Sequence, residues 1–399
     1  MFKLIQGGEV YDPQPRGKQD VLLLNDRIVK VASGIRVPPD FMETEVLKAT
    51  GKIVTPGFID YHNHFLGGGG ASGFASRVPE LPFSRLVAAG ITTVVGCLGM
   101  DCATRSMGAL LGKAFSLEAE GLTTFVYTGA TYEHPVPTLT GSIRDDIIFV
   151  DKVIGVGEVS LSELGPQYDS FGSGAQYIAM IAAQSMNAAR IAGKAGLICL
   201  QVPGRGRGLE PLFDILGRTN LPIRFFIPAH INQNQKYFEQ AIRFAKMGGT
   251  ADVTSAYSPN LGFANAIKPS TAVRLLLESG VGIESITMST DGNGAHPHGE
   301  FLGRPSGSTY LPVRSLHEEF KDLVLQEKIP LEDSLKVFTS NVARALFMPY
   351  RKGTLREGAD ADLLVFAPDL ALDKVLAKGR VVVNEGNVVV KGTYESITG

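Results

Sequence analysis

The sequence predicts an α/β protein: a (β/α)8 TIM barrel that carries a small β-sandwich domain formed by the N- and C-terminal segments. Three observations lead to this fold. Eight short apolar runs alternate with amphipathic segments through the middle of the chain, and β-rich runs lie at both ends. The 399 residues, of which 44% are hydrophobic, can build a large core.

The barrel is predicted from strand and helix repeats that begin after Thr55-Pro56. An open, doubly wound sheet would also alternate strands and helices, but eight regular repeats favour closure, and the length suits a ~250-residue barrel with insertions. Strands are expected at residues 58–61, 92–97, 123–128, 153–159, 197–202, 223–228, 250–254 and 286–290, and helices at 83–89, 107–119, 175–195, 209–218, 237–247 and 271–279.

The chain ends show short β-rich runs broken by Gly, Pro and Asn-Asp turn signals. Neither end is large enough to fold alone, so two separate β appendages are less favoured than one β-sandwich built from both. We therefore expect a β-sandwich of residues 1–54 plus 349–399 and a catalytic barrel of residues 55–348. The strands of the β-sandwich are predicted at residues 2–6, 21–24, 27–32, 362–366, 380–384 and 388–391.

Composition excludes several classes of protein. The 38 Lys and Arg residues nearly balance 40 Asp and Glu, which gives no general electrostatic reason to bind nucleic acid or an anionic membrane. Three cysteines form no CxxC pair and no disulfide framework, and no apolar run reaches the ~18–20 residues of a membrane span. The first residues lack the apolar run of a signal peptide. We expect a cytoplasmic protein without nucleic-acid or membrane partners.

Five ionisable residues close four of the predicted barrel strands. His62 and His64 alternate along the first strand, so both side chains can point to one face, and Glu158, His230 and Asp291 end strands 4, 6 and 8. Taken singly, each of these residues can also be a buried side chain whose hydrogen bonds are made within the core and which has no function in binding or catalysis. Together they meet at the barrel end that carries active sites, and imidazole and carboxylate are zinc ligands. The pattern predicts metal-assisted hydrolysis.

Several motifs resemble a known enzyme superfamily. Residues Thr55–Asp60 (TPGFID) before the HxH pair, Thr339–Ala343 (TSNVA) and Gly353–Leu363 (GTLREGADADL) are similar to signatures of the amidohydrolase superfamily. Within it, the sequence most resembles the isoaspartyl (β-aspartyl) dipeptidase family, over residues 52–392. The matching stretches are residues 67–70, 83–99, 128–130, 140–142, 153–156, 229–232 and 289–294.

The metal ligands depart from that family in two places. The family has a carboxylated lysine on strand 4 that bridges two zinc ions; here Gly157 occupies the apparent position and Glu158 follows. A Glu in this context is similar to adenine-deaminase-type members, and its carboxylate presents the same two oxygens. On strand 5, Gln201 aligns with a His, and an amide is a poorer zinc ligand. The resemblance implies one or two Zn2+ per chain, other divalent metals being alternatives.

The substrate side departs as well. Ala71, Met100 and Gln233 stand where the family has Glu, Thr and a carboxylate-binding Arg, and a second family Arg has no clear equivalent in residues 160–167. Tyr132 matches the Tyr that polarises the substrate in that family, or else it is a packed loop residue. A β-aspartyl dipeptide would lose several charge partners here.

Glycine and arginine loops complete the predicted substrate site. Arg205 and Arg207 follow strand 5 and are candidates to replace the missing arginines, although a solvated loop is the more common role. Gly69 and Gly70 end a glycine run that either presents N–H groups to a substrate carboxylate or forms a turn. No Lys-Ser/Thr follows this run, which argues against a phosphate loop.

The predicted activity is hydrolysis of C–N bonds, amide or isopeptide, by a metal-dependent dipeptidase that takes a small dipeptide-like substrate. Asp291 would act as general base and then acid, and Tyr132 would stabilise the oxyanion. His296 and His298 are candidates to reach the metal or a leaving group, although an exposed loop position is the more common role for such histidines. A deaminase or cyclic-amide hydrolase of the same superfamily, or a non-catalytic barrel retained for binding, are the alternatives. The family resemblance also implies a homo-oligomer.

Overall fold

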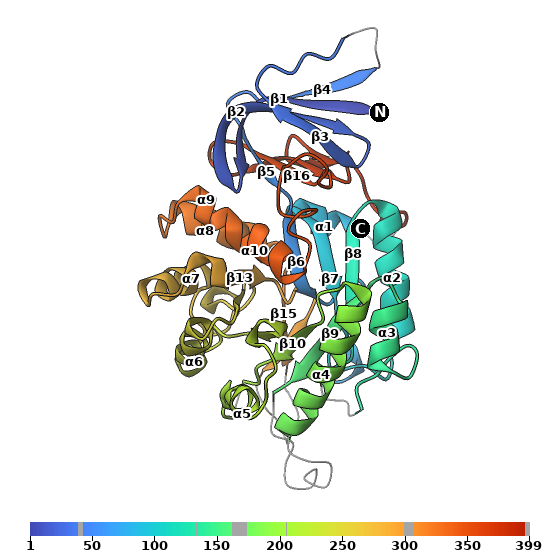
Figure 1. Ribbon diagram of the computed structural model, residues 1–399, viewed down its shortest axis with the longest axis vertical. Helices are drawn as coiled ribbons and strands as arrows, with labels where there is room; N and C mark the ends of the chain where they lie inside the picture. The colour runs from blue at the N-terminus through green and yellow to red at the C-terminus, as the bar shows by residue number, and fades with distance from the viewer. Residues whose placement is uncertain (39–42, 132–134, 162–173, 205, 299–306, 396–399) are drawn as a thin grey trace.

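The computed structural model describes residues 1–38, 43–131, 135–161, 174–204, 206–298 and 307–395. A β-rich region lies at one end of the molecule, and a parallel sheet surrounded by helices forms the rest (Figure 1). Strand β5 (Ile53–Pro56) of the β-rich region is followed almost directly by the first parallel strand, β6 (Phe58–Asn63). The amino end of β6 therefore faces the β-rich region, and its carboxyl end points away from it.

The parallel strands curl in the way that the predicted (β/α)8 barrel requires. In the described residues, six of them pair in the order β11-β10-β9-β8-β7-β6, and β12 pairs with β13. Strand β13 also contacts β6, and β11 contacts β12, so the strands follow one another in chain order. This curled α/β sheet is consistent with the barrel. The strands after β6 are β7 (Ile91–Gly96), β8 (Thr123–Thr128), β9 (Val153–Ser160), β10 (Leu197–Gln201), β11 (Phe226–Ala229), β12 (Ala251–Thr254) and β13 (Ile286–Ser289).

Helices cover the outside of this sheet, and several begin at side-chain caps. Ser106, Ser142 and Asn234 each accept a hydrogen bond from a backbone N–H of the first turn. The six predicted helices are confirmed within a few residues, whereas α3 and α8–α10 were not predicted. The helices are α1 (Phe83–Ala88), α2 (Met107–Glu120), α3 (Ile143–Phe149), α4 (Gly174–Ala192), α5 (Glu210–Arg218), α6 (Gln235–Lys246), α7 (Pro269–Glu278), α8 (Ser315–Leu325), α9 (Leu331–Phe338) and α10 (Ser340–Ala345). None of the helices in the described part of the chain is both long and apolar enough to span a membrane.

The two chain ends share one continuous sheet. Its order in the described residues is β19-β18-β17-β16-β5-β1-β2-β3, with β4 paired to β1. The two chain ends therefore come together in one unit, as predicted. A β-sandwich is not confirmed, because β5 pairs with β1 on one side and with β16 on the other, so that the N- and C-terminal strands belong to the same sheet. The remaining strands of this terminal sheet are β1 (Phe2–Asp12), β2 (Gln14–Leu24), β3 (Arg27–Ala32), β4 (Thr44–Lys48), β16 (Leu363–Phe366), β17 (Leu372–Ala377), β18 (Arg380–Asn384) and β19 (Asn387–Val388).

Aromatic packing and one buried ionic cluster join the terminal sheet to the parallel sheet. The Phe58 ring of β6 lies 5.1 Å from Phe320 and 6.1 Å from Phe366 of β16, centroid to centroid. Lys352, whose side chain is 1% exposed, places Nζ 2.8 Å from Asp360 Oδ2 and also bonds Asp362. The same ammonium donates to Thr123 Oγ1 of β8 at 2.6 Å.

Replacing Lys352 with Met should lower the free energy of unfolding by about 3–5 kcal/mol, because the substitution leaves the buried Asp362 carboxylate without an ion-pair partner in the described residues. Urea denaturation of both proteins measures this difference. Lys268→Met is the matched control, since Lys268 pairs with Asp322 where both side chains are about one-third exposed, and such a pair contributes ~0–1 kcal/mol. Equal losses in the two variants would show that the Lys352 cluster does not hold the two sheets together.

Candidate metal centre

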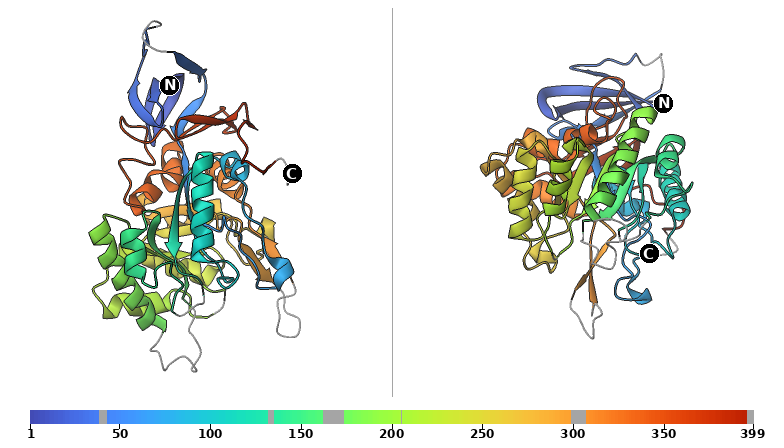
Figure 2. Two further views of the ribbon diagram at one scale, coloured as in Figure 1. Left: turned by 90° about the vertical axis from the view of Figure 1, so that its right-hand side faces the viewer. Right: turned by 60° about the horizontal axis from the view of Figure 1, so that its bottom comes forward.

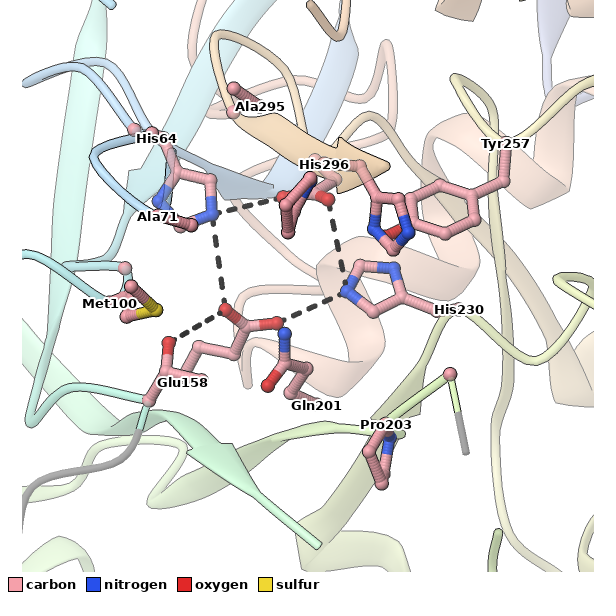
Figure 3. A pocket seen from close by; sticks show the side chains of 18 of the residues that line it. His64, Ala71, Met100, Glu158, Gln201, Pro203, His230, Tyr257, Ala295 and His296 are labelled. Atoms are coloured by element: carbon pink, nitrogen blue, oxygen red, sulfur yellow. Dashed lines mark hydrogen bonds and ion pairs between the residues drawn. The ribbon is translucent and has the colours of Figure 1, made fainter. Parts of the chain in front are cut away.

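Five ionisable side chains converge at the carboxyl ends of four parallel strands. His62 lies in β6 and His64 directly follows it, Glu158 lies in β9, His230 follows β11, and Asp291 lies two residues beyond β13. All five side chains are 7% exposed or less. Figure 3 shows His64, Glu158 and His230 pointing toward one another from separate strands.

The distances between these groups suit a shared metal ion. Two nitrogen or oxygen ligands at ≈2.0–2.1 Å in a tetrahedral site are separated by ~3.3 Å. His230 Nε2 lies 3.1 Å from Glu158 Oε1, and His62 Nε2 lies 3.6 Å from the same oxygen. Asp291 Oδ1 lies 2.9 Å from His64 Nε2 and 3.7 Å from His62 Nε2.

His62 provides a direct test of whether a metal fits. Neither its Nδ1 nor its Nε2 has a hydrogen-bond partner within the described residues, although the side chain is only 1% exposed. An unpaired buried imidazole is costly, and metal coordination removes that cost. Ligand atoms of His62, His230 and Asp291 all lie within 4.8 Å of one another. The donor set therefore fits a divalent cation.

The charges of the centre depend on burial and on mutual attraction. Burial lowers the pKa of His62 to about 4, so its ring is neutral and a nitrogen lone pair is available to a metal. Burial alone would raise the pKa of Asp291 and Glu158, but the facing histidines hold both below their usual range. Burial would likewise lower the pKa of His64 and His230, and the two carboxylates raise it instead. The charged carboxylates thus attract a cation to this point.

His230 is held in place from two sides. Its Nδ1 and its backbone N–H each lie 3.1 Å from Thr254 Oγ1 at the end of β12, which leaves Nε2 directed at Glu158. The ring of Tyr257 stacks on the imidazole at 4.6 Å between centroids, and Phe263 stacks on Tyr257 at 4.5 Å. Tyr257 Oη also lies 3.1 Å from His296 Nδ1. These contacts fix the direction in which His230 presents its ligand nitrogen.

A cavity of about 250 Å³ opens over these groups. Gly69, Ala71, Met100, Gln201 and Gln233, which the sequence placed on the metal or substrate side, all line it. Gln233 donates from Nε2 to Val202 O at 2.8 Å, and Gln201 Oε1 is buried without a hydrogen-bond partner in the described segments. Gln201 lies beside Glu158 in Figure 3.

Other predicted site residues lie elsewhere or outside the described residues. Arg207 is half exposed, pairs with Asp214 at 3.4 Å, and is not among the described residues that line the cavity. Gly70 is not among the described residues that line the cavity, and a Cβ added to it would lie 3.3 Å from Asp101 Cβ. Tyr132 and Arg205 lie outside the described residues.

The hairpin after β13 contains the two loop histidines of the sequence analysis. His296 and His298 both lie in β14 (Ala295–His298), which pairs antiparallel with β15 (Gly307–Tyr310) (Figure 2). His296 lines the cavity and contacts Tyr257. It is therefore a wall residue rather than an exposed loop residue.

Three neighbours of the centre were missed by sequence reasoning. Thr131 donates to Glu158 Oε2 at 3.2 Å, Tyr257 supports His230, and Cys97 Sγ lies 3.7 Å from His64 Nδ1. Each lies within three residues of the end of a parallel strand. Since active sites of this fold are built at strand ends, this position in the sequence could have identified the three residues as neighbours of the site.

Comparisons with known proteins agree with this arrangement. The model of a family described as "Amidohydrolase family" matches residues 228–390. The crystal structure of β-aspartyl dipeptidase from Fervidobacterium islandicum AW-1, in complex with β-Asp-Leu dipeptide, is 37% identical and covers 97% of this chain and 98% of its own, with a TM-score of 0.86. Dihydroorotase of Pelotomaculum thermopropionicum and imidazolonepropionase of Alkaliphilus metalliredigens are each 26% identical, over 93% and 92% of this chain and 90% and 91% of their own.

A curled parallel sheet with histidines and carboxylates gathered at its strand ends defines a hydrolase of the metal-dependent class. The chain belongs to the amidohydrolase family, and its similarity to β-aspartyl dipeptidase covers nearly its whole length. Members of this superfamily use a divalent metal, and the side chains described above are positioned to bind one.

Thr254→Val should weaken metal binding ~10–100-fold, the usual cost of losing the partner that orients a ligating histidine. Competition with a chromogenic chelator measures the affinity. Thr93→Val is the matched control, because Thr93 Oγ1 on β7 is buried without a hydrogen-bond partner in the described residues. Equal affinity in the Thr254 variant and the control would show that Thr254 does not orient His230.

Proposed function

We propose that this protein is a metal-dependent hydrolase of amide or isopeptide C–N bonds, similar in activity to β-aspartyl dipeptidases. The observation that carries the proposal is the convergence of three histidines and two carboxylates, in which the imidazole of one histidine, His62, has no hydrogen-bond partner in the described residues. The 37% identity to a β-aspartyl dipeptidase over nearly the whole chain supports the substrate class.

The five strand-end residues divide into two overlapping ligand sets. We assign His62, His64, Glu158 and Asp291 to a first metal and Glu158 and His230 to a second. Zn2+ is the ion we propose, because the ligands are imidazoles and carboxylates. A bound zinc supplies a Lewis acid that lowers the pKa of water toward neutrality and polarises a carbonyl.

Proton transfer falls to Asp291. It is buried at the cavity wall, and the facing histidines hold its pKa below the usual range, so the carboxylate is charged. In the proposed mechanism this carboxylate accepts a proton from the attacking water. The same carboxyl then donates this proton to the leaving nitrogen. Tyr132, which lies outside the described residues, is proposed to stabilise the oxyanion. Thr131 orients Glu158 through its hydrogen bond to Oε2.

The substrate side favours a second candidate as well. Ala71, Met100 and Gln233 line the cavity with neutral groups where the resembling family has Glu, Thr and Arg. A cyclic amide or an aminopurine needs fewer charge partners than a zwitterionic dipeptide. The match to a dihydroorotase over 93% of the chain supports this cyclic-amide hydrolase or deaminase candidate.

Other features of the proposal rest on the sequence. Gly69, Gly70, Arg205 and Arg207 are proposed substrate contacts, and the protein is proposed to be a cytoplasmic homo-oligomer. The division into residues 55–348 as catalytic unit and the two chain ends as a second unit also remains a prediction.

A substrate panel with zinc-loaded protein tests the proposal. We expect release of aspartate from β-Asp-Leu to be faster than ring opening of hydantoins or dihydroorotate and faster than deamination of aminopurines. Dominant ring opening or deamination would replace the dipeptidase proposal with the second candidate. No turnover of any substrate by protein with bound metal would indicate a barrel retained for binding.

Asp291→Asn should lower turnover by ~10²-fold or more, because an amide can neither accept nor return the proton. Metal content is measured on the same sample, so that loss of a ligand is separated from loss of the base. Asp151→Asn, at an exposed position before β9, is the control and should retain activity. Near-normal turnover in the Asp291 variant would remove this residue from the mechanism.

A further inference from the structure

We propose that Cys97 is a thiolate ligand of the metal bound by His62 and His64. This inference rests on the proposed metal-dependent function and adds a sulfur ligand to it. Ligand atoms of His62, His64 and Cys97 all lie within 4.8 Å of one another, and all three side chains are buried.

The position of Cys97 follows from strand pairing. Cys97 directly follows β7, and its N–H donates to Asn63 O at 3.0 Å, which continues the parallel pairing of β6 with β7. Asn63 lies between the two histidines of β6. The thiol is therefore level with His64 on the neighbouring strand.

The separations suit a tetrahedral site. With Zn–S ≈ 2.3 Å and Zn–N ≈ 2.0–2.1 Å, a sulfur and a nitrogen bound to one zinc are ~3.6 Å apart. Cys97 Sγ lies 3.7 Å from His64 Nδ1 and 3.9 Å from His64 Nε2. Both nitrogens of the buried His62 ring lack a hydrogen-bond partner in the described residues, and a metal would satisfy the nitrogen that it binds.

Cys199 shows what a purely structural cysteine looks like in this sheet. It is buried in β10 and packs in the same apolar cluster as Cys97, with Tyr61 and Tyr127. Among the described residues, however, Cys199 belongs to no group of side chains that could hold a metal. Both thiols are buried in this cluster, and the Cys97 thiol also donates to Asn63 O at 3.6 Å. What distinguishes Cys97 from Cys199 is that its sulfur lies within 4.8 Å of ligand atoms of His62 and His64.

Cys97 would add a thiolate, one of the usual zinc ligands, to His62 and His64. Asp291 keeps the roles of ligand and base that the proposed function gives it, and its Oδ1 lies 2.9 Å from His64 Nε2. The thiol loses its proton to solvent on metal binding, because only the thiolate is a ligand.

Two measurements test the proposal on the whole protein. X-ray absorption of the zinc-loaded wild type should show a sulfur neighbour at ~2.3 Å. Cobalt-loaded wild type and Cys199→Ala should show the intense near-ultraviolet band of a cobalt–thiolate bond, and Cys97→Ala should lack it. Zinc affinity of Cys97→Ala should fall at least ~10–100-fold, the loss that even an orienting partner causes.

The outcomes separate this proposal from the proposed function. Stoichiometric zinc with only nitrogen and oxygen neighbours, or a cobalt–thiolate band that survives in Cys97→Ala, would overturn the Cys97 assignment and leave the hydrolase proposal standing. Wild-type protein that binds no metal at all would overturn both. If Cys97→Ala does not fold, the X-ray absorption of the wild type decides the question alone.

Discussion

The candidate metal centre depends on the junction between the last parallel strand and the first. Asp291 N–H donates to His62 O at 3.0 Å and His64 N–H donates to Gly292 O at 2.9 Å, so the residues after β13 continue the ladder of β6. Asp60 lies beneath this junction, where burial raises its pKa to about 6, and it accepts hydrogen bonds from the Thr290 backbone and hydroxyl. The junction brings a carboxylate from one end of the barrel sequence beside histidines from the other.

The junction confines these side chains to a buried site in which His62 is the one histidine without a hydrogen-bond partner in the described residues. Two carboxylates and three imidazoles are confined to side chains exposed by 7% or less, and burial makes every unpaired charge costly. His62 is neutral and has no hydrogen bond in the described residues, while His230 and Asp291 adopt left-handed backbone angles of φ 61° and φ 52°. Strained backbone and unsatisfied ligands are retained where function requires them.

Much of this arrangement was readable from the sequence because buried parallel strands form nearly continuous apolar runs. The strands β6–β13 were predicted within a few residues for that reason, and their ends identified the five ionisable groups. The terminal sheet was less predictable: the exposed, charged first half of β2 has no strand pattern, and the pairing of β5 with β1 and β16 is a long-range choice. Thr131, Tyr257 and Cys97 were missed because a threonine, an aromatic residue and a cysteine after an apolar run also fit ordinary packing.

The proposed chemistry and the proposed specificity of this protein therefore lie in different parts of the chain. Strand ends hold the histidines and carboxylates, and strand pairing fixes them within the rigid sheet. The residues that depart from the resembling family on the substrate side, Ala71, Met100 and Gln233, lie in the loops beyond those ends. Loops tolerate substitution without disturbing the sheet. A change of substrate can thus be accommodated around an unchanged hydrolytic centre, and the neutral wall of the cavity is the part of the site in which such a change is expected.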